Sequence, residues 1–298
     1  MTPLRFSFQA MASPCESVIG GVSFERAAHA ARLVEQEVKR IEAKYSRFTP
    51  DGILGQINAL AYLEPVALDQ ETQALMDYAD RLYRLSDGLF DITTGTLQTV
   101  WDFKAGVIPE RSALDARLAH VGWHHVQRQN GQLRLADDQV RLDLGGFGKE
   151  YAADRAAAVL RAEGIESGYV DLGGDICVVG PKSDGRPWSI GIRHPRKAKQ
   201  LIASLDVPLG AVATSGDYER YFMHQGRRYC HILSPKTGMP VSHWQSVSVM
   251  APMASLAGAT CTIAMLKEAD GLDFLHQSGF SFLAIDAEGQ THTHNRET

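Results

Sequence analysis

The segment from Asp143 to Asp154, DLGGFGKEYAAD, carries residue types that could bind an anion. The apolar residues at its start predict a buried strand, the glycines predict a turn, and the residues after Gly148 predict an amphipathic helix. Glycines let a backbone approach an anion closely, and the first N–H groups of a helix point toward it. Lys149 adds a positive charge at this helix start. The segment predicts a phosphate-binding turn, with a plain strand-turn-helix as the alternative.

Spacing excludes two familiar phosphate motifs for this segment. A Walker loop needs a glycine five residues before the Gly-Lys pair and a Ser or Thr after it, where this chain has Asp143 and Glu150. A dinucleotide fingerprint needs a third glycine where Tyr151 stands. A phosphate site built on this segment must therefore be of another kind.

Charge and composition narrow the classes of partner. The net charge of -5, without a block of Lys and Arg, argues against nucleic acid or an anionic membrane, and it favours small molecules or other proteins. No run approaches the ~18 apolar residues of a membrane helix, and the first fifteen residues lack the pattern of a signal peptide. We therefore expect no membrane insertion and a cytoplasmic protein. The four cysteines lack C-x-x-C spacing, which predicts reduced core residues rather than a zinc site.

Apolar spacing predicts a mixed α/β fold. Steps of three and four residues predict helices over Ala27–Tyr45, Gln70–Asp87, Lys149–Glu163 and from about Ser255. Two short strands are expected between residues 5 and 21. Further strand candidates are His125–Val126, Gln132–Leu135, Val140–Leu144, Gly168–Leu172, Ile176–Val179, Trp188–Ile192, Ala211–Thr214 and Val247–Met250. No repeat or linker divides the order, so residues 1–298 are expected to form a single domain with a smaller lobe roughly within 70–140.

Four polar clusters rich in turn residues accompany these elements, at residues 88–95, 171–175, 214–220 and 231–240. Each one alone is typical of an ordinary turn, because Gly, Asp, Ser and Pro suit turn backbones. Together they place acids, hydroxyls and an imidazole at the edges of strands or helices, which is how binding groups are mounted on a rigid scaffold.

The order of these motifs resembles the ApbE-like flavin transferases, the FAD:protein FMN transferases, over nearly the whole chain. The matching positions are Met11-Ala12-Ser13, Ser46-Arg47-Phe48 with Asn58, Gly88 to Leu97, Asp143 to Asp154, Gly173-Gly174-Asp175, Thr214 to Tyr218, and His231-Ile232 with Pro235, Thr237, Gly238 and Pro240. The resemblance implies a two-lobed α/β architecture related to the T-fold. It also implies that FMN is moved from FAD to a Ser or Thr hydroxyl of an acceptor flavoprotein, with release of AMP and with Mg²⁺ on the pyrophosphate.

The resemblance also implies roles for individual residues. His231 and Lys149 are the catalytic candidates: a general base or orienting group, and a charge on the phosphates. The implied cofactor contacts are Met11, Phe48, Leu89, Phe90, Asp91, Asp143, Lys149, His231 and Ile232. The implied metal ligands are the backbone carbonyl near Gly146 and the hydroxyl of Thr262.

The chain departs from the family pattern where the metal is expected. The family has A-D-A-x-x-T, whereas this chain has Gly258 in place of the aspartate. Ser234 replaces another family aspartate, and Glu150 replaces the glycine after the lysine. Because Mg²⁺ prefers one or two carboxylates, metal affinity is expected to fall. Three functions stay open: an active transferase, a noncatalytic FAD-binding protein, and an FAD pyrophosphatase that uses water as acceptor.

Overall fold

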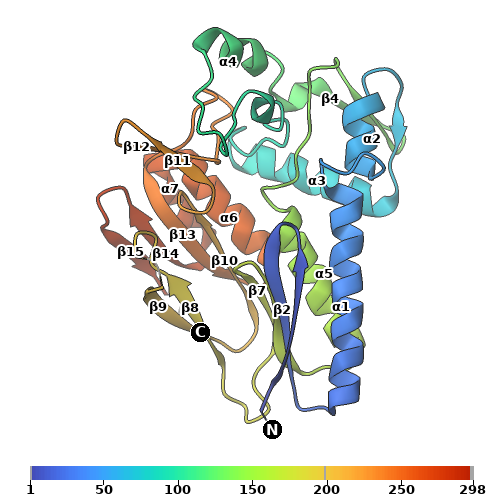
Figure 1. Cartoon of the computed structure of the whole chain (residues 1–298), viewed down its shortest axis with the longest axis vertical. Coiled ribbons are helices and arrows are strands. Elements are labelled where there is room, and N and C mark those ends of the chain that lie inside the picture. Colours follow the sequence, from blue (N-terminus) through green and yellow to red (C-terminus); the bar gives the residue numbers. More distant parts are fainter. Residues whose placement is uncertain (1, 198, 296–298) are drawn as a thin grey trace.

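A single large sheet organises the fold. The computed structural model describes residues 2–197 and 199–295, and within them eight strands pair in the order β1-β2-β6-β7-β10-β13-β14-β15 (Figure 1). These strands are β1 Leu4–Ala10, β2 Ser13–Gly20, β6 Ser167–Leu172, β7 Asp175–Gly180, β10 Gly210–Gly216, β13 Trp244–Ala251, β14 Ser281–Asp286 and β15 Thr291–His294. Every ladder in this sheet is antiparallel. The predicted mixed α/β class is confirmed.

Three helices cover one face of the sheet. They are α1 Phe24–Tyr45, α5 Gly148–Ala162 and α6 Ala254–Lys267, and all three contribute to the main core. α1 forms because its apolar residues recur on one side, and because the side chain of Ser23 accepts a hydrogen bond from the N–H of Arg26 at its start. α6 is buried almost all round, as expected for a helix enclosed between the sheet and its neighbours.

A two-stranded sheet packs on the opposite face. It consists of β8 Trp188–Arg193 and β9 Leu201–Val207, which the large sheet meets through a separate apolar cluster. Along β8, buried and exposed residues alternate, so that Trp188, Ile190 and Ile192 point inward against Val18 and Val212. The sheet is therefore covered on both faces.

Many of the remaining elements gather at one end, where Figure 1 shows α2 in blue and α3, α4 and β4 in cyan to green. The remaining elements are α2 Ile53–Leu60, β3 Val66–Ala67, α3 Gln70–Leu85, η1 Leu97–Thr99, α4 Arg111–Leu118, η2 Trp123–His125, β4 Val126–Gln129, β5 Gln132–Leu135, β11 Tyr221–His224, β12 Arg227–Cys230, η3 Glu268–Asp270 and α7 Gly271–Ser278. A small core of Leu97, Trp101, Leu114 and Leu233 joins segments from both halves of the chain. The lobe expected within residues 70–140 stays a prediction. Within the described residues, no helix has both the length and the apolar character to cross a bilayer.

The long helices were predicted correctly, but the strand predicted at Val140–Leu144 is wrong. This segment makes only one isolated bridge, between Arg141 and Thr94. Side chains replace the ladder: Asn58 bonds both the N–H and the carbonyl of Leu142, at 2.7 and 2.9 Å. An apolar run predicts burial, and here burial comes without strand pairing.

Asp154 of α5 holds the start of α6. Its carboxylate accepts hydrogen bonds from the backbone N–H groups of Ala254 and Ser255, at 2.7 and 2.9 Å. The residue that precedes α6, Met253, makes no side-chain cap of its own. A carboxylate from one helix therefore satisfies the free N–H groups of the next and fixes their relative position.

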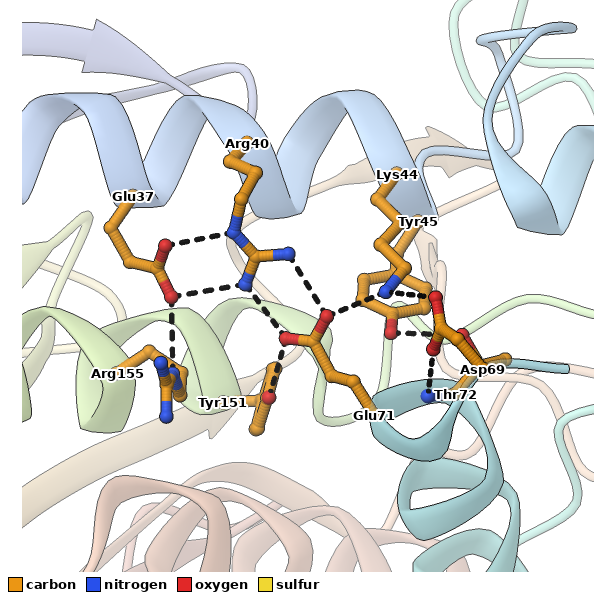
Figure 2. A network of polar contacts seen from close by, with 9 residues as sticks. All are labelled: Glu37, Arg40, Lys44, Tyr45, Asp69, Glu71, Thr72, Tyr151 and Arg155. Carbon is orange, nitrogen blue, oxygen red and sulfur yellow. Dashed lines mark hydrogen bonds and ion pairs between the residues drawn. The ribbon is translucent and has the colours of Figure 1, made fainter.

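A charged network fixes the other side of α5. Figure 2 shows Glu71 of α3 at its centre, bonded to Arg40 and Lys44 of α1 and to the Tyr151 hydroxyl of α5, at 2.7, 2.6 and 2.8 Å. Hydrogen bonds from Arg40 are the main cause that holds the pKa of Glu71 well below its usual range, against the opposing effect of burial. The network binds α1, α3 and α5 together.

Replacing Asp154 tests the cap. We expect Asp154→Ala to lower the free energy of unfolding by about 2 kcal/mol, because two N–H groups of α6 lose a charged acceptor. Urea unfolding followed by circular dichroism measures the change. Asp51→Ala, at an exposed position, is the control and should change stability by less than about 0.5 kcal/mol. Equal effects of the two substitutions would contradict the role of Asp154.

Replacing Glu71 tests the network through its pH dependence. A carboxylate whose folded-state pKa is lowered stabilises the fold above its unfolded pKa, and this stabilisation is lost as the pH falls. Glu71→Gln should therefore cost about 1 kcal/mol at pH 7, and the difference from the parent should shrink below about pH 4. Glu35→Gln, which removes an exposed pair within α1, is the control. A Glu71→Gln difference that does not vary with pH would contradict the account.

Candidate active site around the glycine turn

The glycine turn before α5 presents Lys149 to a second glycine turn. The N–H groups of Phe147 and Gly148 both bond the carbonyl of Leu144, at 3.0 and 2.7 Å, which closes the turn and starts the helix. The Lys149 ammonium then lies 2.8 Å from the buried carboxylate of Asp175. Burial alone would lower the pKa of Lys149, but the charge of Asp175 and that of Glu150 raise it. Lys149 therefore stays a cation at the start of a helix.

The second turn joins β6 to β7 through Gly173 and Gly174, with φ of 64° and 101°. A Cβ on Gly173 would lie 2.8 Å from the Cβ of Ser13 and 3.6 Å from the Lys149 nitrogen. Only glycine fits there without strain. The turn thus brings the β1–β2 hairpin next to Lys149.

Glu150 faces α6 from the first turn of α5. Its side chain is buried, and its Oε2 atom has no hydrogen-bond partner among the described residues. Burial and, after it, the charge of Asp175 raise the pKa of Glu150 above its usual range. A buried carboxylate without a partner is costly, so it indicates a site that a proton or a cation completes.

Gly258 of α6 lies directly opposite that carboxylate. A Cβ built on Gly258 would approach Glu150 to 2.5 Å at Oε1 and 2.6 Å at Cγ. Thr262 follows one helical turn later on the same face of α6, and its hydroxyl lies 3.1 Å from that of Ser215 on β10. Glu150 therefore occupies the space next to Gly258 that a longer side chain there would need.

Asp143 is already engaged by protein groups. It accepts hydrogen bonds from Arg47 at 2.8 Å, from Gln98 at 2.9 Å, and from the N–H of Gly145 at 2.9 Å. The Arg47 guanidinium also lies over the ring of Phe48, 4.6 Å from its centroid. Phe48 is 78% exposed, so the ring face away from Arg47 can receive another flat ring.

Met11 lies at the tip of the β1–β2 hairpin. Met11 and Ala12 have φ of 51° and 55°, so two residues with a Cβ adopt the left-handed conformation of a two-residue turn. The N–H of Met11 bonds the Glu42 carboxylate of α1 at 2.6 Å. A backbone conformation that costs energy is thus held in place by a charged acceptor.

Leu89, Phe90 and Asp91 have different surroundings, and Phe90 is the one that packs against the glycine turn. Phe90 is buried against Phe147, with ring centroids 6.2 Å apart, and a Cβ on Gly146 would lie 2.8 Å from its ring. Asp91 is also buried, and its Oδ1 accepts hydrogen bonds from both the N–H and the hydroxyl of Thr93. Leu89 is partly buried against the main core. Phe90 thus packs behind Gly146, and Asp91 is used locally.

His231 follows β12 and is largely enclosed. Its N–H bonds the carbonyl of Arg220 at 3.0 Å, and its Nδ1 is buried without a partner among the described residues. Burial, followed by the charges of Arg220 and Lys149, lowers the pKa of His231 to about 4. The imidazole is therefore neutral near pH 7 and able to accept a proton. The adjacent Ile232 is partly buried against the main core.

The sequence predicted Lys149 and His231 as site residues but did not predict the side chains that contact the site. Asp175 and Arg47 stand within quoted motifs, and Glu42 stands shortly before one. No spacing rule, however, pairs them with Lys149, Asp143 and Met11, which they contact. The Gly-Gly-Asp cluster at residues 173–175 was the available signal for Asp175, because it places an acid directly after a glycine turn.

The side chains at this site could supply only part of the coordination shell of a magnesium ion. Among residues 2–197 and 199–295, no three His, Cys, Asp or Glu side chains converge in a way that could hold a metal. Mg²⁺, however, commonly takes one or two carboxylates and completes its shell with water and substrate phosphates. The unpartnered Glu150 carboxylate and the Thr262 hydroxyl meet this smaller requirement. The predicted metal positions, Gly146 and Thr262, lie near α5 and on α6 and stay predictions.

The fold is that of a known family. The ApbE family model matches residues 11–283, so this chain belongs to the ApbE family. Among solved structures, the ApbE protein from Thermotoga maritima superimposes with a TM-score of 0.91 at 30% identity, covering 98% of this chain and 97% of that one. The flavin transferase ApbE from Vibrio cholerae gives a TM-score of 0.86 at 26% identity, with 98% and 96% covered.

Three curated relatives that match this chain in sequence are each named FAD:protein FMN transferase. The FAD:protein FMN transferase of Vibrio cholerae serotype O1 is 32% identical over 218 residues, which are 70% of this chain and 64% of that relative. The FAD:protein FMN transferase of Escherichia coli K12 is 28% identical over 284 residues, or 92% and 81%. That of Treponema pallidum is 33% identical over 254 residues, or 76% and 70%.

Replacing Lys149 tests its pairing with Asp175. Lys149→Met should lower the free energy of unfolding by about 3 kcal/mol, because it leaves a buried carboxylate unpaired. The double variant Lys149→Met/Asp175→Asn should recover part of this loss, since it removes the unpaired charge as well. Urea unfolding of the parent, both single variants and the double variant measures the coupling. Additive effects of the two substitutions would contradict a direct pair.

Proposed function

We propose that this chain is an FAD:protein FMN transferase that moves FMN from FAD to a Ser or Thr hydroxyl of an acceptor protein and releases AMP. The observation that carries the proposal is the Lys149 ammonium at the start of α5, which lies 2.8 Å from Asp175 and beside the β6–β7 glycine turn. Family membership over residues 11–283 supports it.

Lys149 and the glycine turn would bind the pyrophosphate of FAD. The start of α5 carries the positive end of the helix dipole, and Lys149 adds a full charge beside it. Asp175 orients the ammonium through the 2.8 Å contact. At the flavin end, the exposed ring of Phe48 and the hairpin tip at Met11 are the expected apolar contacts.

The transfer forms a bond between the acceptor oxygen and the phosphorus of the FMN half, and it breaks the bond from that phosphorus to the AMP oxygen. AMP leaves with the electron pair of the broken bond. The proton of the acceptor hydroxyl goes to the neutral imidazole of His231. Nδ1 of His231 has no partner among the described residues, so no protein contact fixes which ring nitrogen takes the proton.

A magnesium ion would neutralise charge on the pyrophosphate at this site. Glu150 and Thr262 are the side chains that would hold this ion. At the flavin end, Asp143 would keep Arg47 in position through their ion pair. The expected cytoplasmic location stays a prediction from the sequence. The acceptor is proposed only by its chemistry: a protein that exposes a Ser or Thr hydroxyl.

Replacing His231 tests the transfer step. His231→Asn should leave the FAD dissociation constant within about threefold and lower FMN transfer by at least ~100-fold, because the proton acceptor is lost while the phosphate contacts remain. The assay mixes the protein, FAD, MgCl₂ and an extract of the source cells, and it records covalent flavin fluorescence on a denaturing gel and AMP by chromatography. His29→Asn, on an exposed part of α1, is the control.

The same assay separates the alternatives. AMP release with free FMN and no labelled protein would instead identify an FAD pyrophosphatase. Tight FAD binding with neither AMP nor labelled protein would instead identify a noncatalytic FAD-binding protein. Equal transfer by the parent and His231→Asn would remove His231 from the mechanism.

A further inference from the structure

Two positions on facing helices fit each other in an unusual way. Glu150 on α5 has a long acidic side chain, and Gly258 on α6 has none. A Cβ on Gly258 would meet three atoms of Glu150, at 2.5 Å from Oε1, 2.6 Å from Cγ and 2.8 Å from Cδ. With Glu150 in this position, even an alanine at position 258 would collide with it, so the glycine leaves the space that the glutamate fills.

The Glu150 carboxylate lacks the partners that a buried acid needs. Its Oε2 has no hydrogen bond among the described residues. Lys149 pairs with Asp175 at 2.8 Å, so this ammonium is already engaged by another carboxylate. If both buried carboxylates are ionised, the one ammonium leaves a negative charge that only a further cation can balance.

The surrounding oxygens suit a hard divalent cation. Thr262 stands one turn beyond Gly258 on the face of α6 that Glu150 touches, and its hydroxyl is held 3.1 Å from the hydroxyl of Ser215. Lys149 is adjacent on α5 and turns toward the β6–β7 glycine turn. A cation at Glu150 would thus lie beside the place where Lys149 meets phosphate.

We propose that Glu150 on α5 supplies the carboxylate ligand of the divalent cation in this chain. Gly258 on α6, which has no side chain, leaves the room that this carboxylate occupies. The proposal rests on the proposed function for the pyrophosphate that completes the shell. It replaces the expectation of a weakened metal site with a relocated one.

The capping contact from Asp154 makes this exchange geometrically possible. Asp154 lies one turn after Glu150 on α5 and bonds the first N–H groups of α6. The two helices therefore run past each other in opposite directions here: Asp154 lies at Ala254, and one turn away Glu150 lies at Gly258. A carboxylate carried by either helix can reach the same space between them.

Four variants test the proposal: Glu150→Gln, Glu150→Gly, Gly258→Asp and the double variant Glu150→Gly/Gly258→Asp. Mn²⁺ serves as the probe, because the electron paramagnetic resonance signal of free Mn²⁺ reports binding without any turnover. Each titration is run with and without FAD and without an acceptor. Melting temperatures are recorded with chelator and with Mn²⁺. Glu163→Gln, at the far end of α5, is the matched control.

We expect Glu150→Gln to weaken Mn²⁺ binding at least ~10-fold and to remove the Mn²⁺-dependent rise in melting temperature. Its melting temperature in chelator should equal or exceed that of the parent, because a neutral amide replaces an unpaired buried acid. Gly258→Asp alone should melt lower, since it collides with Glu150. The double variant should melt at a higher temperature than Gly258→Asp. It should also bind Mn²⁺ more tightly than Glu150→Gly.

Parent-like Mn²⁺ binding by Glu150→Gln would overturn the cation role of Glu150. A double variant that is no better than either single variant would overturn the exchange between the two positions. The proposed function fails separately: a parent that binds Mn²⁺ through Glu150 but never releases AMP would refute the transferase and leave this inference standing.

Discussion

The contact on which the site most depends is the one between the Asp154 carboxylate and the first N–H groups of α6. It joins the middle of α5 to the start of α6, two helices from distant parts of the chain, through N–H groups that would otherwise lack partners. Lys149 and Glu150 stand about one turn before Asp154, and Gly258 and Thr262 stand one and two turns after Ala254. The network around Glu71 then holds the opposite side of α5, so the helix can neither shift nor rotate freely (Figure 2).

Charge within this framework is distributed unevenly. Lys149 has a close anionic partner in Asp175, and Asp143 has a close cationic partner in Arg47. Glu150 and His231 do not: each keeps one polar atom buried and unpaired. Such atoms cost stability in the isolated protein, so they indicate where a substrate, a proton or an ion completes the structure. The two engaged pairs position the site, and the two unpaired groups are left to react or to bind.

Much of the scaffold was predictable because it follows local rules. The spacing of Val34, Val38 and Ile41 predicts α1 wherever the helix packs, and the Gly-Lys start predicts α5. The strand predicted at Val140–Leu144 was wrong for a physical reason. The backbone of this segment bonds the side chains of Asn58 and Thr96 and the carbonyl of Ile92 in place of a neighbouring strand. The direction of Glu150 was equally hidden. It depends on the space between α5 and α6, which no single segment of sequence contains.

The fit between Glu150 and Gly258 also constrains how such a sequence arises by descent. An ancestor with glycine at 150 and aspartate at 258 would need two substitutions to reach this chain. One order passes through a form with no acid between the helices, and the other through a form with two acids in the space for one. Neither intermediate keeps a single acid between the helices. The effect of a substitution at either position therefore depends on the residue at the other. A survey that scores each motif separately would record a missing aspartate and classify such descendants as inactive, although the acid has only changed helices.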